Sequence, residues 1–218
     1  MIKGLIFDLD GTLLDTIDDI AQAMNDALQE MGLNRHSLEE YKVLVGSGIK
    51  NLAESVLPPE YHNPEGIEGF IGTFREHYAR SWHNKTKPYS GIVEMLNLLR
   101  ATDLRLAILS NKSQRFTAAM ADYWFMAEGK QTFDPVWGER AGIPVKPNPQ
   151  AALAIAEQWG LSPQEIAFIG DSDVDMQTAV NAGMLAIGVE WGFRSVAELL
   201  ESGAQCILQK PEELLKHI

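Results

Sequence analysis

Two aspartates, Asp8 and Asp10, lie at the end of a short and mostly apolar run that begins at Ile2. Such a run is typical of a buried parallel strand. Residues two apart on extended backbone point to the same side, so we expect the two carboxylates to lie together. Two unit charges about 4 Å apart repel by about 4 kcal/mol at an effective dielectric constant of about 20. The pair therefore predicts a cation between them.

Three further polar clusters each follow a predicted strand: Ser110 with Asn111, then Lys146, and then Asp171 with Asp175. Any one of them alone is ordinary turn chemistry, because Ser, Asn and Asp favour strand ends. The carboxyl ends of parallel strands, however, meet at one edge of a sheet, where ligands bind. We therefore expect all the clusters to converge on one site.

The residue types at that site favour phosphoryl transfer. Asp171 adds a third oxygen ligand to those of Asp8 and Asp10, and an all-oxygen, carboxylate-rich set suits Mg²⁺. A calcium loop fits less well because the acids come from distant segments. A carboxylate nucleophile needs no base, and we expect Asp8 to attack phosphorus while Asp10 acts as general acid and base.

The phosphoryl oxygens need cations and hydrogen-bond donors around them. We expect Mg²⁺ and Lys146 to neutralise them. The predicted cradle consists of Ser110, the Asn111 side chain and the backbone N–H groups after Asp8, at Gly11 and Thr12.

The hydrophobic pattern divides the chain into two kinds of structure. Residues 17–31, 49–57 and 65–82 have helical spacing, Ser37 and Glu40 form a capping-box pair, and no strand is expected between residues 16 and 86. Strands and helices alternate from residue 87, with strands expected at 104–109, 166–169, 185–189 and 206–208 and Asn148 capping a helix. We predict an α/β core of residues 1–15 and 87–218, a doubly wound parallel sheet, with a helical cap of residues 16–86 over its carboxyl edge.

Composition limits the partners. The chain has 218 residues, a formal net charge of −12 and a single cysteine, Cys206. An acidic surface disfavours nucleic acid and anionic membranes, so we expect neither as a partner. No signal peptide and no apolar run of about 18 residues is visible, which predicts a cytoplasmic protein. The expected partner is a small phosphorylated metabolite, and the protein is expected to be a monomer or a homodimer.

Four segments resemble the motifs of the haloacid dehalogenase superfamily in order and spacing: DLDGT (8–12), LSN (109–111), VKPNP (145–149) and GDSDVD (170–175). The resemblance implies a Rossmann-like core with Asp8 as nucleophile. It implies Mg²⁺ held by the Asp8 carboxylate, the Asp10 backbone carbonyl and Asp171, with Asp175 orienting a metal-bound water or Lys146. It also implies a cis Lys146–Pro147 bond, and the presence of Asp10 favours a phosphatase or phosphomutase over a dehalogenase.

A narrower resemblance is to the phosphoglycolate phosphatases. It is carried by VGSGIKNL (45–52) and by GVEWGFRS (188–195), whereas Gln205 stands where relatives commonly have Asp. It implies 2-phosphoglycolate as substrate and makes Gly46, Ser47, Gly48 and Lys50 candidates for substrate contact. A plain helix–helix turn and a solvated lysine are the alternatives for these four residues.

Three other functions stay open at this point. A sugar phosphomutase would transfer phosphate between hydroxyls without releasing it. A broader phosphatase would act on sugar phosphates, nucleotides or pyrophosphate. A phosphometabolite-binding module would have lost catalysis, although no member of the expected catalytic set is missing.

Overall fold

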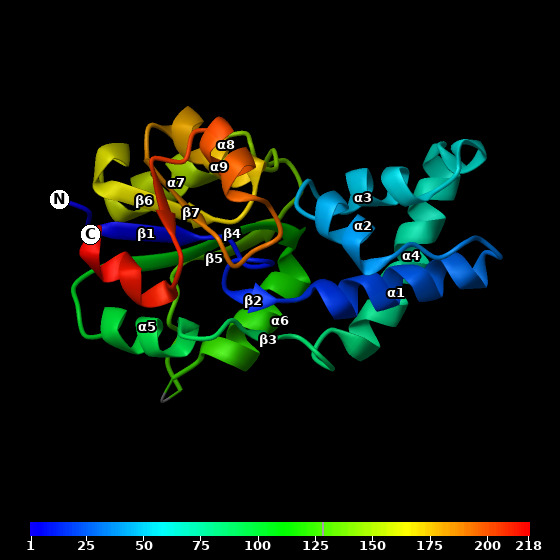
Figure 1. Cartoon of the computed structure of the whole chain (residues 1–218), viewed down its shortest axis with the longest axis horizontal. Coiled ribbons are helices and arrows are strands. Elements are labelled where there is room, and N and C mark those ends of the chain that lie inside the picture. Colours follow the sequence, from blue (N-terminus) through cyan, green and yellow to red (C-terminus); the bar gives the residue numbers. More distant parts are fainter. Residues whose placement is uncertain (128) are drawn as a thin grey trace.

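The protein is built on a parallel sheet, described here from a computed structural model of residues 1–127 and 129–218 (Figure 1). Six strands lie in the order β5-β4-β1-β6-β7-β8, and each neighbouring pair is parallel. The strands are β1 (Gly4–Phe7), β4 (Arg105–Ser113), β5 (Val136–Glu139), β6 (Ile166–Gly170), β7 (Leu185–Val189) and β8 (Cys206–Leu208). The predicted doubly wound α/β sheet is confirmed.

Helices cover both faces of the sheet. Leu5 and Phe7 of β1 pack in one apolar cluster with α5 (Ile92–Leu99) and α6 (Gln114–Phe125), whereas Ile6 packs in a second cluster with α7 (Gln150–Trp159) and α8 (Asp173–Ala182). Successive strand residues point to opposite faces, so a strand that is buried on both sides must be apolar throughout. The remaining helix of this part, α9 (Val196–Glu201), packs against β7.

Four helices form a separate layer at one end of the sheet (Figure 1). They are α1 (Ile17–Glu30), α2 (Leu38–Leu44), α3 (Ile49–Val56) and α4 (Pro64–Ser81). The capping box of Ser37 and Glu40 opens α2 as predicted. No strand is found between residues 16 and 86, all of which are described, in agreement with the sequence pattern. The division into domains at these two residues stays a prediction.

The two chain segments that lead into and out of this layer are tied together. Asp15 pairs with Lys87 in a short antiparallel ribbon of β2 (Leu14–Asp15) and β3 (Lys87–Pro88). One turn further, the buried Asp19 carboxylate accepts hydrogen bonds from the Thr86 backbone N–H and hydroxyl, both at 2.8 Å. Hydrogen bonds to a buried charged acceptor are strong. The two segments that connect the helical layer to the sheet are therefore held firmly side by side.

Two details differ from the sequence expectation and one agrees. The strand expected to end at Leu109 continues to Ser113, because β5 pairs with it there after a register shift. Asn148 does accept from the Gln150 N–H at 2.9 Å, but the helix begins at Gln150 and Pro149 precedes it. The Lys146–Pro147 bond is cis, as predicted.

Among the described residues, no helix has the length and apolarity needed to cross a membrane.

An arginine of the sheet part holds the end of a helix in the helical layer. Arg194, in the loop after β7, donates hydrogen bonds to the backbone carbonyls of Lys42, Val43 and Val45, the last two at 2.7 and 2.9 Å. Carbonyls at a helix C-terminus lack partners within the helix. The guanidinium therefore satisfies the end of α2 directly before the Gly46-Ser47-Gly48 loop.

This contact gives a first prediction. Replacing Arg194 by Ala removes the donors from three carbonyls, so we expect the free energy of unfolding to fall by about 1–3 kcal/mol. We also expect faster hydrogen exchange in peptides that cover residues 38–48. Arg80→Ala, an exposed arginine on α4, is the control. Equal exchange in the two variants would show that Arg194 does not hold this segment.

Candidate active site

Three buried carboxylates and one lysine meet at the carboxyl ends of two neighbouring strands. Asp8 follows β1, Asp171 follows β6, and Asp175 lies in the first turn of α8; each offers an oxygen within 4.8 Å of the others. Lys146 Nζ lies 2.8 Å from Asp8 Oδ1 and 2.6 Å from Asp175 Oδ1. The topology thus brings together four residues separated by up to 167 positions, as the sequence analysis expected.

The charges in this cluster are not balanced by protein groups. Burial raises the pKa of Asp8, although the positive charge of Lys146 lowers it in part. Burial also raises the pKa of Asp171, and the negative charges of Asp175 and Asp8 raise it further. Burial acts to lower the pKa of Lys146, but Asp175 and Asp8 raise it more, so this lysine is charged. One ammonium among three carboxylates leaves a site whose ionised form needs another cation.

The remaining hydrogen bonds fix the acids in place. Asp171 accepts from the Thr12 hydroxyl and from the Phe193 backbone N–H, both at 2.9 Å. Asp175 accepts from the backbone N–H and the hydroxyl of Ser172. Its other oxygen lies against Lys146, which is one of the two positions that the resemblance implied for Asp175.

Asp10 has its own cation. Lys112 Nζ donates to both oxygens of the Asp10 carboxylate, at 3.1 and 3.0 Å, and lies 4.6 Å from the centre of the Tyr78 ring. Each of the two carboxylates thus has its own lysine, because Lys146 contacts Asp8 and Lys112 contacts Asp10. A further cation between the two side chains stays a prediction. The sequence analysis missed Lys112, although it follows the LSN segment directly.

The predicted phosphate-binding residues lie around Asp8, but the side chains of four of them, Thr12, Ser110, Asn111 and Lys146, are already engaged. The Thr12 hydroxyl donates to Asp171. The Asn111 amide accepts from the Lys146 N–H at 2.8 Å and donates to the carbonyls of Lys146 and Gly46. Asn111 therefore joins β4, the lysine loop and the helical layer. The phosphate-binding roles of Gly11, Thr12, Ser110 and Asn111 stay predictions.

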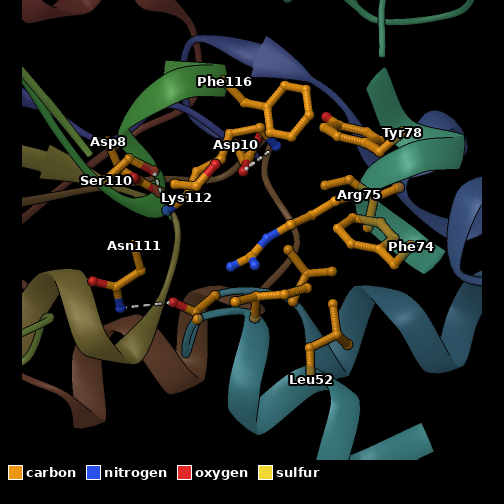
Figure 2. Close-up of a pocket in the computed structure, with 16 residues that line it drawn as sticks. Asp8, Asp10, Leu52, Phe74, Arg75, Tyr78, Ser110, Asn111, Lys112 and Phe116 are labelled. Carbon is orange, nitrogen blue, oxygen red and sulfur yellow. Dashed lines mark hydrogen bonds and ion pairs between the residues drawn. The ribbon is translucent and has the colours of Figure 1, made fainter. Parts of the chain in front are cut away.

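A cavity of about 80 Å³ lies between the sheet edge and the helical layer (Figure 2). Asp8, Asp10, Ser110, Asn111 and Lys112 line it from the sheet side. Apolar side chains make up much of the rest: Ile20, Val45, Ile49, Leu52, Phe74 and Phe116. The small volume favours a small substrate.

The helical layer contributes different residues from those expected. Gly46 and Gly48 line the cavity, but Ser47 and Lys50 do not, and Lys50 is exposed. The cation that α4 extends toward the cavity is Arg75, which the sequence analysis did not single out (Figure 2). Phe74 and Tyr78 of α4 are buried and also line the cavity. Phe74, Arg75 and Tyr78 lie within one turn of the same helix. This spacing was the signal in the sequence that could have placed Arg75 at the cavity.

The site thus has two carboxylates at the cavity. Asp8 is buried and paired with Lys146, and Asp10, two residues further along the chain, is paired with Lys112. The site also has a charge deficit that a cation would relieve. This set can carry out nucleophilic attack by Asp8 and proton transfer by Asp10 on a small anionic substrate.

Comparisons with known proteins agree with this chemistry. The family model of haloacid dehalogenase-like hydrolases matches residues 5–189. A phosphoglycolate phosphatase from Chromobacterium violaceum is 34% identical over 91% of this chain and 89% of that protein. One from Aquifex aeolicus is 30% identical over 99% of this chain and 96% of that protein.

Solved structures give the same result for the fold. A structure from Lactobacillus delbrueckii subsp. bulgaricus, itself only provisionally assigned as a phosphoglycolate phosphatase, covers 99% of this chain and 98% of its own with a TM-score of 0.89 and 32% identity. The match includes the helical layer as well as the sheet. On its sequence, its fold and the arrangement of its buried acids, this chain belongs to the haloacid dehalogenase-like hydrolases, as a phosphatase of that family.

Proposed function

We propose that this protein is a Mg²⁺-dependent phosphatase that hydrolyses 2-phosphoglycolate through a phosphorylated Asp8. The observation that carries the proposal is the Asp8 carboxylate, which lines the cavity while Lys146 holds its Oδ1 at 2.8 Å. The substrate follows from the relatives named phosphoglycolate phosphatase and from the small cavity. A cytoplasmic location and a small-molecule partner go with this function.

The buried acids fit a hard divalent cation. The donor set is made of carboxylate oxygens, which Mg²⁺ prefers, and its negative charge exceeds that of the one lysine present. Asp8 and Asp171 would hold the ion, with the Asp10 backbone carbonyl, and Asp175 would orient Lys146. When bound, Mg²⁺ supplies positive charge to the phosphoryl oxygens and so lowers the repulsion that Asp8 meets.

The chain's own residues then carry two steps. Asp8 attacks phosphorus, the bond from phosphorus to the ester oxygen breaks, and Asp10, in its protonated form, gives its proton to the leaving oxygen. Asp10 next removes a proton from water, which attacks phosphorus and releases Asp8 and inorganic phosphate. Lys146, held by Asp8 and Asp175, neutralises charge on the phosphoryl group in both steps. Lys112 keeps the Asp10 carboxylate at the cavity.

The sugar phosphomutase is the weaker alternative. A hexose phosphate carries several hydroxyl groups, and each would lose its water in the cavity. The side chains that face the cavity from the helical layer are apolar apart from Tyr78 and Arg75, and unpaired buried hydroxyls are costly.

The nucleophile is tested by Asp8→Asn. The amide cannot attack phosphorus, so we expect release of inorganic phosphate from 2-phosphoglycolate to fall at least about a thousandfold. Removal of Mg²⁺ with a chelator should abolish release by the wild type. Asp18→Asn, an exposed acid in the helical layer, is the charge-matched control. Turnover by Asp8→Asn at the wild-type rate would refute the mechanism. If the wild type instead transferred phosphate to a second hydroxyl without releasing it, the mutase would be favoured.

The ligand role of Asp171 is tested through a neighbouring glycine. A Cβ at Gly192 would lie 2.1 Å from the Asp171 Cβ, so Gly192→Ala must displace this acid. We expect the Mg²⁺ concentration for half-maximal phosphate release to rise about tenfold or more, as for other residues that support metal ligands.

The control for that variant is Gly69→Ala on α4, where an added Cβ meets no atom within 4 Å. Circular dichroism would establish that both variants are folded. A Gly192→Ala enzyme with an unchanged Mg²⁺ requirement would argue against Asp171 as a ligand.

A further inference from the structure

Two cations line the active-site cavity, and they differ in their partners. Lys112 is only 8% exposed and is paired with the Asp10 carboxylate at 3.0 Å. Arg75 is exposed, and among the residues that the structure describes none forms an ion pair or hydrogen bond with its side chain. Lys146 lies deeper and is held between Asp8 and Asp175. Arg75 is therefore the cation at this cavity that can bind an anion without first breaking an ion pair.

The position of Arg75 places it across the cavity from the nucleophile. It projects from α4, next to Phe74 and one turn before Tyr78, and its guanidinium extends into the space that faces Asp8 and Ser110 (Figure 2). Phe74 and Tyr78 are buried and their rings stack at 5.3 Å, so this stretch of the helix is firmly packed. A substrate whose phosphate meets Asp8 would direct its other end toward Arg75.

The surroundings of Arg75 favour one compact anionic group. Ile20, Ile49 and Leu52 of the helical layer line the same cavity and offer no polar partner. Among the described residues that line the cavity from the helical layer, Arg75 is the one charged side chain, so it is the group that a second anionic end of the substrate would meet there. The protein as a whole carries a net charge of −12, so a substrate with a second negative group needs a local cation to enter.

We infer that Arg75 is the residue that selects for a carboxylate on the substrate, binding it while the phosphate lies at Asp8. The planar guanidinium can donate two parallel hydrogen bonds to a carboxylate, which an ammonium group cannot do in the same geometry. This inference rests on the proposed function and assigns recognition of the acid end of 2-phosphoglycolate to the helical layer. The sheet edge supplies the chemistry common to any phosphate monoester.

The test compares two substrates of similar size. Ethyl phosphate has a methyl group where 2-phosphoglycolate has its carboxylate. We would measure kcat and KM for both with the wild type, Arg75→Gln and Arg75→Lys. Each substrate is compared between variants, so differences in leaving-group chemistry cancel. Arg80→Gln, on the same helix but outside the cavity lining, is the matched control.

The expected result is a change in selectivity. For Arg75→Gln, kcat/KM for 2-phosphoglycolate should fall about 10- to 100-fold more than kcat/KM for ethyl phosphate, mainly through KM. Arg75→Lys should recover part of the loss, because it keeps the charge but loses the paired donors. Arg80→Gln should leave the ratio of the two substrates as in the wild type.

Two other results would overturn the inference, and they are distinguishable. If Arg75→Gln loses the same factor on both substrates, or loses nothing, while the wild type hydrolyses 2-phosphoglycolate, Arg75 does not select the carboxylate and the proposed function stands. If the wild type hydrolyses ethyl phosphate at least as well as 2-phosphoglycolate, the proposed substrate is wrong and the inference fails with it.

Discussion

The structure depends on keeping Lys146 buried between the carboxylates of Asp8 and Asp175. A buried charge is costly unless it is paired, and three acids with one lysine remain mutually repulsive. The fold holds them together with ion pairs and with hydrogen bonds from Thr12, Ser172 and Phe193. Added Cβ atoms at Gly11 and Gly192 would both collide with Asp171, so glycine at these positions lets the backbone approach the acid. Excess negative charge assembled in this way favours a divalent cation and an anionic substrate bound together.

The cavity has two walls with different tasks. The sheet edge presents the acids, lysines and hydroxyls to which the proposed mechanism assigns the chemistry, whereas the helical layer presents mostly apolar side chains and Arg75. The walls are physically continuous, since Tyr78 of α4 packs edge-on against Phe116 of α6 at 4.8 Å. Asn111 and Arg194 add hydrogen bonds from the sheet part to residues 42–46. The hydrogen bonds and ring contacts between the two walls therefore hold the helical layer over the sheet edge.

Positive charge is scarce in this protein, and the position of each cation near the site is informative. The chain has 18 basic and 30 acidic side chains, so a surface field alone would repel a phosphorylated acid. Lys146 contacts Asp8, the proposed nucleophile, and Lys112 contacts Asp10 on one side and the Tyr78 ring on the other. Arg75 lines the cavity and has no ion-pair or hydrogen-bond partner among the residues that the structure describes. The positive charge near the site thus comes from three residues in three different segments of the chain, and it offsets only part of the negative charge of the acids.

The sequence by itself determined the sheet, the helical layer and the acids that converge at the sheet edge. These features depend on local patterns: apolar strands, helical spacing and polar residues just past each strand. It did not determine which cation each acid contacts, that the Asn111 amide is used to join loops, or that Arg75 and not Lys50 reaches the cavity. Those facts depend on the rotation of α4 about its axis and on the close approach of loops over 100 residues apart. Only tertiary packing sets such distances, because local propensity does not encode which side chains from separate elements meet.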